Sequence, residues 1–476
     1  MSNIQSLETL FSGLDPFLTN SDECYVALKM RGRDELYRVE SEAFRQVVHA
    51  QLSSPKITKI SNDEWKAATT SLAGQARVNN RTEEVFVRVA ENGGCIYIDL
   101  ATPNRDIVEV SAMGWKIIQQ APVHFYRPSG MLPLPVPTRP GNLLPLRALV
   151  NVASEPDYIL LVSWMLSALR RQAVYPVLVL MGEQGTAKST SAEVIRALID
   201  PRALETQSLS NTEQDLAIAA KNAHLLAFDN LSKVSSHMSD ALCRLSTGGG
   251  LATRRLYTNA EQETFSGTRP FLLSGITDFV TKSDLADRAI FLRLPVMDKA
   301  KRRMKSALLE QFNSDAPQIF AGLLNALVHG LAHVDSVPCS DLGRMADFEV
   351  WSMACEEALT ELGMFREALR ANADAKIDDL IEGDPLAQAI CDLMERRPIW
   401  TGTSQQLMGS LVRLGQHARM GLPPNASALS KQLRASEATL RAKGIVIEKR
   451  RAGSAGKRII EITNKNMPAE GMPEAA

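Results

Sequence analysis

The residues best suited to chemistry lie in one short stretch near the middle of the 476-residue chain. The stretch consists of Gly182, Glu183, Gln184, Gly185, Thr186, Ala187, Lys188, Ser189 and Thr190. Its two glycines can adopt backbone angles that point successive N–H groups at an anion. Lys188 can reach the β- and γ-phosphates of ATP, and the Ser189 hydroxyl can bind Mg²⁺. The stretch therefore predicts a phosphate-binding loop with ATP and Mg²⁺ as its ligands.

The segments on either side match what a phosphate-binding loop requires. The apolar run Val177–Met181 predicts a buried strand before the loop, and a helix is predicted from near Lys188 to Ile199. Ala187 stands where a glycine usually precedes the lysine, but its single methyl group is small, so we expect the loop to close. A chance glycine turn is the alternative. The joint presence of strand, turn, Lys-Ser pair and helix favours nucleotide binding.

A second strand is predicted at Ala223–Asn230, an apolar run whose last two residues are Asp229 and Asn230. Asp229 at the end of a buried strand would lie beside the phosphates and hold the Mg²⁺ shell. The next residue is Asn230, where many ATPases have a second acid that polarises water. Asparagine can orient water but cannot accept its proton, so we expect slow turnover unless another acid such as Asp240 serves. The alternative for Asp229 is a simple strand-end acid.

Further motifs follow in a fixed order. They are Thr-Gly-Gly-Gly at 247–250, Arg254-Arg255-Leu-Tyr, an apolar strand at 270–276, and Asp287-Arg288 before another strand. Together with the loop and the Asp-Asn strand, this order resembles the superfamily 3 helicases, especially the helicase half of phage and poxvirus primase–helicases. The resemblance covers about residues 175–296. It implies an AAA+ ATPase that forms a ring, usually a hexamer, around a nucleic-acid strand.

The resemblance also implies roles for single residues. Arg254 and Arg255 would face the central pore, although a solvated turn is the alternative. Ser274 would end the strand that senses the γ-phosphate, with Thr277 as a second candidate. Arg288 would be an arginine finger that reaches the ATP of a neighbouring subunit, where its charge offsets that of the transition state. A strand-edge ion pair is the alternative for Arg288.

A local excess of positive charge lies in the C-terminal part. Residues 430–458 have a surplus of seven positive charges in a chain whose net charge is −1. Helices predicted at 386–395, 404–418 and 425–443, followed by a hairpin at 444–462, are typical of a winged helix that binds DNA. The bases are Lys431, Arg434, Arg441, Lys443, Lys449, Arg450, Arg451, Lys457 and Arg458. A solvated charge run on a protein-contact module is the alternative.

These patterns divide the chain into predicted parts. They are an α+β N-terminal domain at 1–126, a Pro-rich linker at 127–143, the AAA+ P-loop core at 144–296, a helical lid at 297–382, a winged helix at 383–463 and a disordered tail at 464–476. The N-terminal domain would contain strands at 24–30 and 35–39, two helices and a strand meander. Asp99 has no acidic partner at strand spacing, so a strand-end role is preferred to a catalytic one.

Composition argues against a disulfide-stabilised protein, a zinc protein and a membrane-spanning protein. The six cysteines form no CxxC pair, and no stretch reaches the ~20 apolar residues that span a bilayer. The N-terminus lacks a basic segment followed by an apolar one, so a cytoplasmic protein without membrane contact is expected. His329 and His333 share one helix face, but no third zinc ligand is evident.

The sequence therefore predicts an ATP-dependent DNA helicase or translocase from the replication system of a phage or mobile element. It would be a homo-oligomer, with single-stranded DNA in the pore and a duplex or fork at the winged helix. The alternative is a slowly hydrolysing, nucleotide-dependent switch or loader on DNA, which Asn230 favours. A metabolic kinase is disfavoured, because an arginine finger and a basic winged tail have no purpose there.

Overall fold

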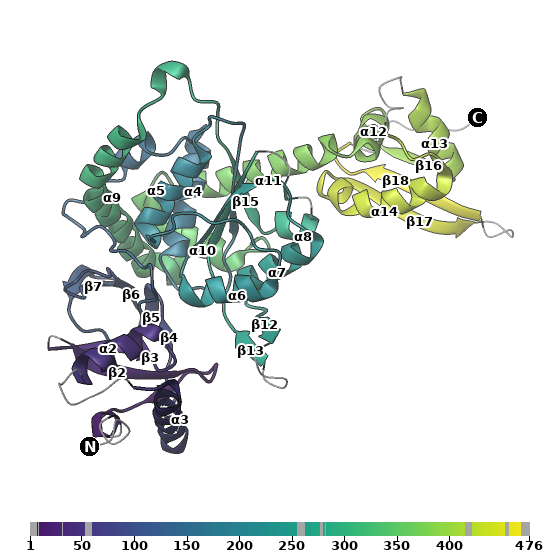
Figure 1. The fold of residues 1–476 in the computed structure, drawn as a ribbon. Helices are drawn as coiled ribbons and strands as arrows, with labels where there is room; N and C mark the ends of the chain where they lie inside the picture. The colour runs from purple at the N-terminus through teal and green to yellow at the C-terminus, as the bar shows by residue number, and fades with distance from the viewer. Residues whose placement is uncertain are drawn as a thin grey trace, which may run out of the picture. The chain divides into compact units, whose positions relative to one another are not determined.

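The computed structural model describes residues 7, 9–30, 32–52, 60–254, 262–276, 279–280, 282–414, 421–452 and 457–467. The chain forms two compact units, Met1–Leu369 and Arg370–Ala476 (Figure 1), and helix α11 (Met364–Glu382) contains the boundary. Helices and sheets occur in both units, so the prediction of a mixed α/β chain is confirmed. Among the described residues, no helix is both long and apolar enough to cross a membrane.

The first unit begins with a small antiparallel sheet packed against two helices. The strands are β1 (Phe17–Leu18), β2 (Cys24–Met30) and β3 (Arg33–Arg38), and the helices are α2 (Glu42–Leu52) and α3 (Asn62–Asn79). The strands pair in chain order. Phe44, Val48, Trp65 and Leu72 are buried between the sheet and the helices. The predicted strand pair and both predicted helices are confirmed.

The predicted meander follows, and it has four antiparallel strands, of which β8 was not predicted. Its strands are β5 (Val89–Asn92), β6 (Cys95–Asp99), β7 (Ile107–Ser111) and β8 (Gly114–Ile118), beside the short parallel pair β4 (Val85–Phe86) and β9 (His124–Phe125). Arg88, between β4 and β5, has a left-handed φ of 71° and turns the chain there. Ile98 and Val108 belong to the same hydrophobic core as helices α4 (Glu155–Ala168) and α9 (Lys305–His333).

The Pro-rich stretch at 127–143 is extended and contains no helix or strand. It is nevertheless packed against its neighbours. The Leu134 N–H donates to Leu100 O (2.9 Å), the Thr138 N–H donates to Pro317 O (3.1 Å), and the Leu134 side chain is buried. The stretch is thus extended, as expected of a connector, and Leu134 is in addition part of the hydrophobic core.

A parallel sheet lies at the centre of the first unit. It has the strand order β11 (Leu226–Leu231), β14 (Phe271–Gly275), β10 (Val177–Met181) and β15 (Ala289–Arg293). Leu178 and Leu180 pack toward α4 and α5 (Lys188–Ile199), whereas Val177 and Val179 pack toward α6 (Glu213–Asn222) and α7 (Ser236–Thr247). Because helices cover both faces, β10 is apolar throughout, as the sequence predicted.

The remaining elements of the first unit extend from this sheet. They are η1 (Leu144–Ala148), the antiparallel pair β12 (Leu251–Arg254) and β13 (Gln262–Phe265), α8 (Ser283–Ala286), η2 (Lys299–Lys301), η3 (Val334–Ser336), α10 (Ala346–Cys355) and η4 (Glu356–Ala358). The long helix α9 packs against α10, so the region after the sheet is helical as predicted.

The second unit combines three helices with a three-stranded antiparallel sheet. The helices are α12 (Pro385–Met394), α13 (Ser404–Arg413) and α14 (Ala426–Ala442), and the strands are β16 (Ile399–Gly402), β17 (Ile445–Ala452) and β18 (Lys457–Asn464). The sheet order is β16-β18-β17, and Leu407, Leu433 and Ile462 are buried in its core. The three helices and the hairpin were predicted, but β16 was not, because a four-residue strand at 399–402 has no distinctive pattern.

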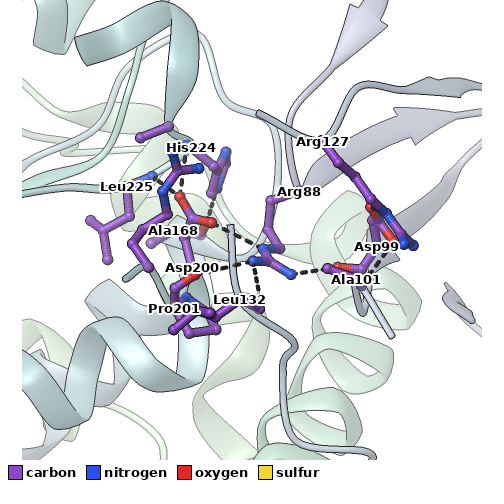
Figure 2. Close-up of polar contacts among 12 residues, drawn as sticks. Arg88, Asp99, Ala101, Arg127, Leu132, Ala168, Asp200, Pro201, His224 and Leu225 are labelled. Carbon is purple, nitrogen blue, oxygen red and sulfur yellow. Dashed lines mark hydrogen bonds and ion pairs between the residues drawn. The ribbon is translucent and has the colours of Figure 1, made fainter. Parts of the chain in front are cut away.

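A buried ion pair joins the meander to the central sheet (Figure 2). The Arg88 Nε donates to Asp200 Oδ1 at 3.0 Å, and both side chains are fully buried. Arg88 also donates to the carbonyl oxygens of Asp99 (2.9 Å) and Leu132 (2.7 Å). Asp99 pairs with Arg127 and accepts from the Ala101 N–H, which confirms a structural role for this strand-end acid.

Asp200 also connects two elements of the central sheet. It ends helix α5, and its Oδ2 accepts from the N–H groups of His224 (2.9 Å) and Leu225 (3.2 Å), just before β11. Burial raises the pKa of Asp200, but Arg88, together with His224, Arg202 and the Leu225 N–H, more than offsets this, so the pKa lies below its usual range. Burial lowers the pKa of His224 to about 4, so this imidazole is neutral and donates from Nε2 to Ala168 O.

We predict that Arg88→Met lowers the free energy of unfolding of the first unit by about 3–5 kcal/mol, because it leaves the Asp200 carboxylate buried without its partner. Denaturant titration of the full chain measures this change. Arg77→Ala is the control, because the Arg77–Asp22 pair is 54% and 65% exposed, and it should cost less than about 1 kcal/mol. The double variant Arg88→Met/Asp200→Asn should recover part of the loss. Equal effects of Arg88→Met and Arg77→Ala would contradict the conclusion that the buried Arg88–Asp200 pair matters more for stability than an exposed pair.

Candidate functional site

The loop between β10 and α5 has the backbone geometry that its glycines predicted. Gly182 has φ 155° and Gly185 has φ 84°, both in the region that favours glycine. A Cβ atom on Gly182 would lie 2.8 Å from Leu294 O, so no larger residue fits there. Ala187 has φ 58°, a left-handed conformation, and forms the N-cap of α5. The loop thus closes with alanine in place of the usual glycine, as predicted.

Lys188 lies against the loop that precedes it. Its Nζ donates to Gly182 O and Glu183 O at 2.7 Å each, and more weakly to Thr186 Oγ1 at 3.3 Å. Partial burial lowers the pKa of Lys188, and the nearby Asp229 carboxylate acts in the opposite direction. The amine is therefore held at the mouth of the loop, close to the acid on β11.

Asp229 and Ser274 meet at the carboxyl ends of the neighbouring strands β11 and β14. The Ser274 hydroxyl donates to Asp229 Oδ1, and the Asn230 N–H donates to the same oxygen at 2.7 Å. Asn230 has φ 58°, where β11 changes its pairing register. Ser274 is fully buried, so it orients the Asp229 carboxylate within the site.

Asn151 ties the loop to the segment after β15. Its Nδ2 donates to Thr186 O at 3.0 Å and to Pro295 O at 2.7 Å. Its backbone N–H donates to Ser191 Oγ on α5 at 3.3 Å. The sequence analysis missed this residue, because a single asparagine 31 positions before the loop carries no local signal.

Arg288 lies at the other end of the sheet. It precedes β15, and its carbonyl accepts from the Val177 N–H at the start of β10 (2.8 Å). The five-residue β10 therefore separates it from the loop by roughly 16 Å along the strand direction. Its guanidinium pairs with Asp284, which also pairs with Arg344. The ion pair offered as the alternative is present, and Arg288 cannot serve the loop of its own chain.

The predicted pore residues fall on the β12–β13 pair. Arg254 ends β12 and pairs with Gln262 on β13, but its side chain lies outside the described residues. Arg255 and Thr277 also lie outside them. The Thr-Gly-Gly-Gly motif ends helix α7, where Gly248 has φ 82° and caps the helix. This motif therefore connects the end of α7 to the start of β12.

The bases of the second unit differ in whether they already pair with an acidic side chain. Lys443, Lys449 and Arg450 pair with Asp378, Glu437 and Glu461 respectively. Lys431 and Arg434 are exposed on α14, and neither forms an ion pair with the part of the unit that the structure describes. Arg451 and Arg458 face each other in register on β17 and β18. The Lys457 side chain lies outside the described residues.

Comparison with protein families identifies the chain. Residues 143–380, half of the chain, match the family described as "Actinomycete integrative conjugative element replication protein". Residues 386–473 match the C-terminal domain of the same RepA proteins. The chain belongs to this replication protein family. The prediction that it acts in the replication of a mobile element is therefore confirmed.

Solved structures give only distant likenesses to this replication protein. The NrS-1 C-terminal region has a TM-score of 0.44 and 13% identity, with 97% of this chain and 98% of that chain covered. The JCV helicase has a TM-score of 0.24 and 15% identity, with 47% and 66% covered. Such scores are too low to define a shared fold. A search of curated proteins found no match.

The two family matches meet close to the boundary between the two units of this replication protein. The first ends at residue 380 within α11, and the second begins at residue 386 within α12. The first contains every predicted residue of the nucleotide loop, together with Asp229, Ser274 and Arg288. The second contains the exposed bases of α14. The two candidate sites thus belong to separate parts of the family.

We predict that Ala187→Gly raises the free energy of unfolding of this replication protein by up to about 1 kcal/mol, because glycine relieves the left-handed backbone of an alanine. Thermal or denaturant unfolding measures this change. Ala197→Gly, within helix α5, is the matched control and should lower stability by about 1 kcal/mol. A loss of stability in Ala187→Gly would contradict the strain assigned to this position.

Proposed function

We propose that this replication protein is an ATP-driven DNA motor of the superfamily 3 helicase type. The observation that carries the proposal is the meeting of Lys188, Asp229 and Ser274 beside a glycine loop, at the carboxyl ends of three adjacent parallel strands. Ligands of α/β sheets bind at such strand ends. The start of α5 adds unpaired N–H groups and a favourable dipole for phosphate.

The proposal assigns a specific role to each residue of the site. The loop from Gly182 to Lys188 would bind the phosphates of ATP, because the positive φ angles of Gly182 and Gly185 allow its backbone N–H groups to turn toward an anion. Ser189 and Asp229 would hold Mg²⁺, which supplies charge neutralisation on the phosphates when bound. Ser274 would keep Asp229 oriented. Asn230 would orient the attacking water without accepting its proton.

The position of Arg288 supports an assembly of several chains. Its distance along β10 from its own loop means that an arginine finger at this position must act on a neighbouring subunit. We propose a ring, with hexamer as the expected size, in which the pair β12–β13 faces a central strand of DNA. Asp284 holds Arg288 in the isolated chain, and formation of the ring would release it.

We further propose that the second unit is a winged helix that binds duplex or forked DNA. Its three helices and its hairpin of β17 and β18 support this proposal, in which α14 would act as the recognition helix. Lys431 and Arg434 have no intramolecular ion pair to break, among the described residues, before they contact phosphate.

A second candidate is a slowly hydrolysing switch or loader on DNA. Asn230 favours it, because no acid follows Asp229 on β11. The two candidates differ in whether DNA accelerates ATP hydrolysis and whether hydrolysis separates strands.

For the motor, we predict that single-stranded DNA stimulates ATP hydrolysis by the full chain. Lys188→Ala and Arg288→Ala should each reduce turnover by at least about 100-fold. Mixing the two variants should restore part of the activity, because some shared sites then contain an intact lysine and an intact arginine. Arg344→Ala, which removes the other arginine from Asp284, is the control and should retain most of the activity. ATP binding with negligible turnover that DNA does not change would contradict the motor and support the switch.

For the winged helix, we predict that Lys431→Gln/Arg434→Gln weakens duplex binding and lowers the salt dependence of log K by about two, since each phosphate contact contributes a slope of about one. Fluorescence anisotropy of the full chain across a salt series measures both. Lys443→Gln is the matched control, because Lys443 already pairs with Asp378. Equal losses in both proteins would point to general charge instead of a docking face on α14.

A further inference from the structure

The segment after β15 runs beside the phosphate loop and is fixed at both ends. At its start, the Leu294 N–H donates to Met181 O (2.8 Å), and Pro295 O accepts from Asn151 (2.7 Å). At its end, the Arg303 guanidinium donates to Ala148 O (2.7 Å) and to Gln311. The short helix η2 lies between these anchors, with Asp298 as its cap. The residues between the anchors are therefore held at the mouth of the loop.

Arg302 is the residue of this segment that reaches the loop. A Cβ atom on Gly185 would lie 3.2 Å from Arg302 Nη2 and 3.9 Å from Cζ, so the guanidinium rests against this glycine. The side chain is exposed, and it makes no hydrogen bond or ion pair with the described part of the chain. By contrast, the neighbouring Arg303 is fully engaged in anchoring. An arginine that has no side-chain partner in the described part of the chain thus lies beside a loop whose backbone suits an anion.

We propose that Arg302 binds the phosphate chain of the nucleotide in the same subunit, as a second cation beside Lys188. The inference rests on the proposed ATP site and adds a contact from outside the loop. A guanidinium can donate two parallel hydrogen bonds to phosphate, and such charge-assisted bonds are stronger than neutral ones. Lys188 already donates to two loop carbonyls, which leaves part of its bonding capacity for phosphate. Among the described residues, none accepts a hydrogen bond from the Arg302 guanidinium, so its donors are available to phosphate.

The position of Arg302 in the chain connects the proposed phosphate contact to the helix α9. It stands three residues before α9, the long helix that packs on α10 and on the meander strands β7 and β8. A phosphate that holds Arg302 would therefore also fix the start of α9. Binding of nucleotide would be communicated to the helical region by a residue from outside the P-loop and its acids.

Titration of the full chain with MgATP, read by its thermal unfolding temperature and by a direct binding isotherm, tests the proposal. We expect Arg302→Gln to leave the unfolding temperature without nucleotide unchanged. It should weaken ATP binding by about 10-fold or more, the loss typical of a charge-assisted hydrogen bond. Arg302→Lys should recover part of the affinity. Lys299→Gln removes one exposed charge from the same segment and should change affinity by less than about twofold.

Lys188→Ala separates failure of this inference from failure of the proposed function. If wild type binds ATP, Lys188→Ala does not, and Arg302→Gln binds as wild type does, Arg302 is no phosphate ligand and the ATP site stands. Equal losses in Arg302→Gln and Lys299→Gln would also overturn the inference, because they show only general charge. If wild type binds no ATP, or Lys188→Ala binds equally well, the proposed ATP site falls and the role of Arg302 falls with it.

Discussion

The buried ion pair between Arg88 and Asp200 is the constraint on which the first unit depends. Two charges removed from water are stable only when their hydrogen bonds are satisfied, and here they are. Arg88 donates to Asp200 and to backbone carbonyls from three segments, while Asp200 accepts from the chain that leads into β11. The pair therefore sets the meander, the end of α5 and the start of β11 relative to one another.

The proposed nucleotide site lies at the far ends of these same elements. Helix α5 begins at Lys188 and is capped at its end by Asp200, and β11 begins just after Leu225 and carries Asp229. Fixing one end of each element fixes the separation of the lysine and the acid at the other end. Local contacts then complete the site: Ser274 orients Asp229, and Asn151 holds the loop. The geometry of the loop thus depends on a charge pair at the opposite ends of these elements.

Local patterns explain what the sequence could predict. A continuous apolar strand, a glycine turn and a Lys-Ser pair lie within fourteen consecutive residues, so the strand, loop and helix were placed correctly from sequence alone. Asp229 was found in the same way, as the acid at the end of an apolar run. The strand pair at β2 and β3 and the helices of the second unit also follow from local periodicity.

Contacts between distant residues could not be predicted. Arg88 and Asp200 are 112 positions apart, and nothing near either residue marks it as buried. The Ser274–Asp229 bond, the Asn151 tether and the approach of Arg302 to Gly185 likewise exist only because the parallel sheet brings separate segments to one edge. The burial of Leu134 could not be predicted either. The proline-rich composition of its segment indicates only an extended connector, whereas the Leu134 side chain is part of the hydrophobic core.

A structure of the full chain with a non-hydrolysable ATP analogue and Mg²⁺ tests the central claim most directly. The account predicts phosphates on the N–H groups of the loop, with Lys188 turned toward them and the metal between Ser189 and Asp229. The Arg88–Asp200 pair should be unchanged. A structure in which the analogue lies elsewhere, or in which Lys188 keeps only its contacts to Gly182 and Glu183, would contradict a nucleotide site at this sheet edge.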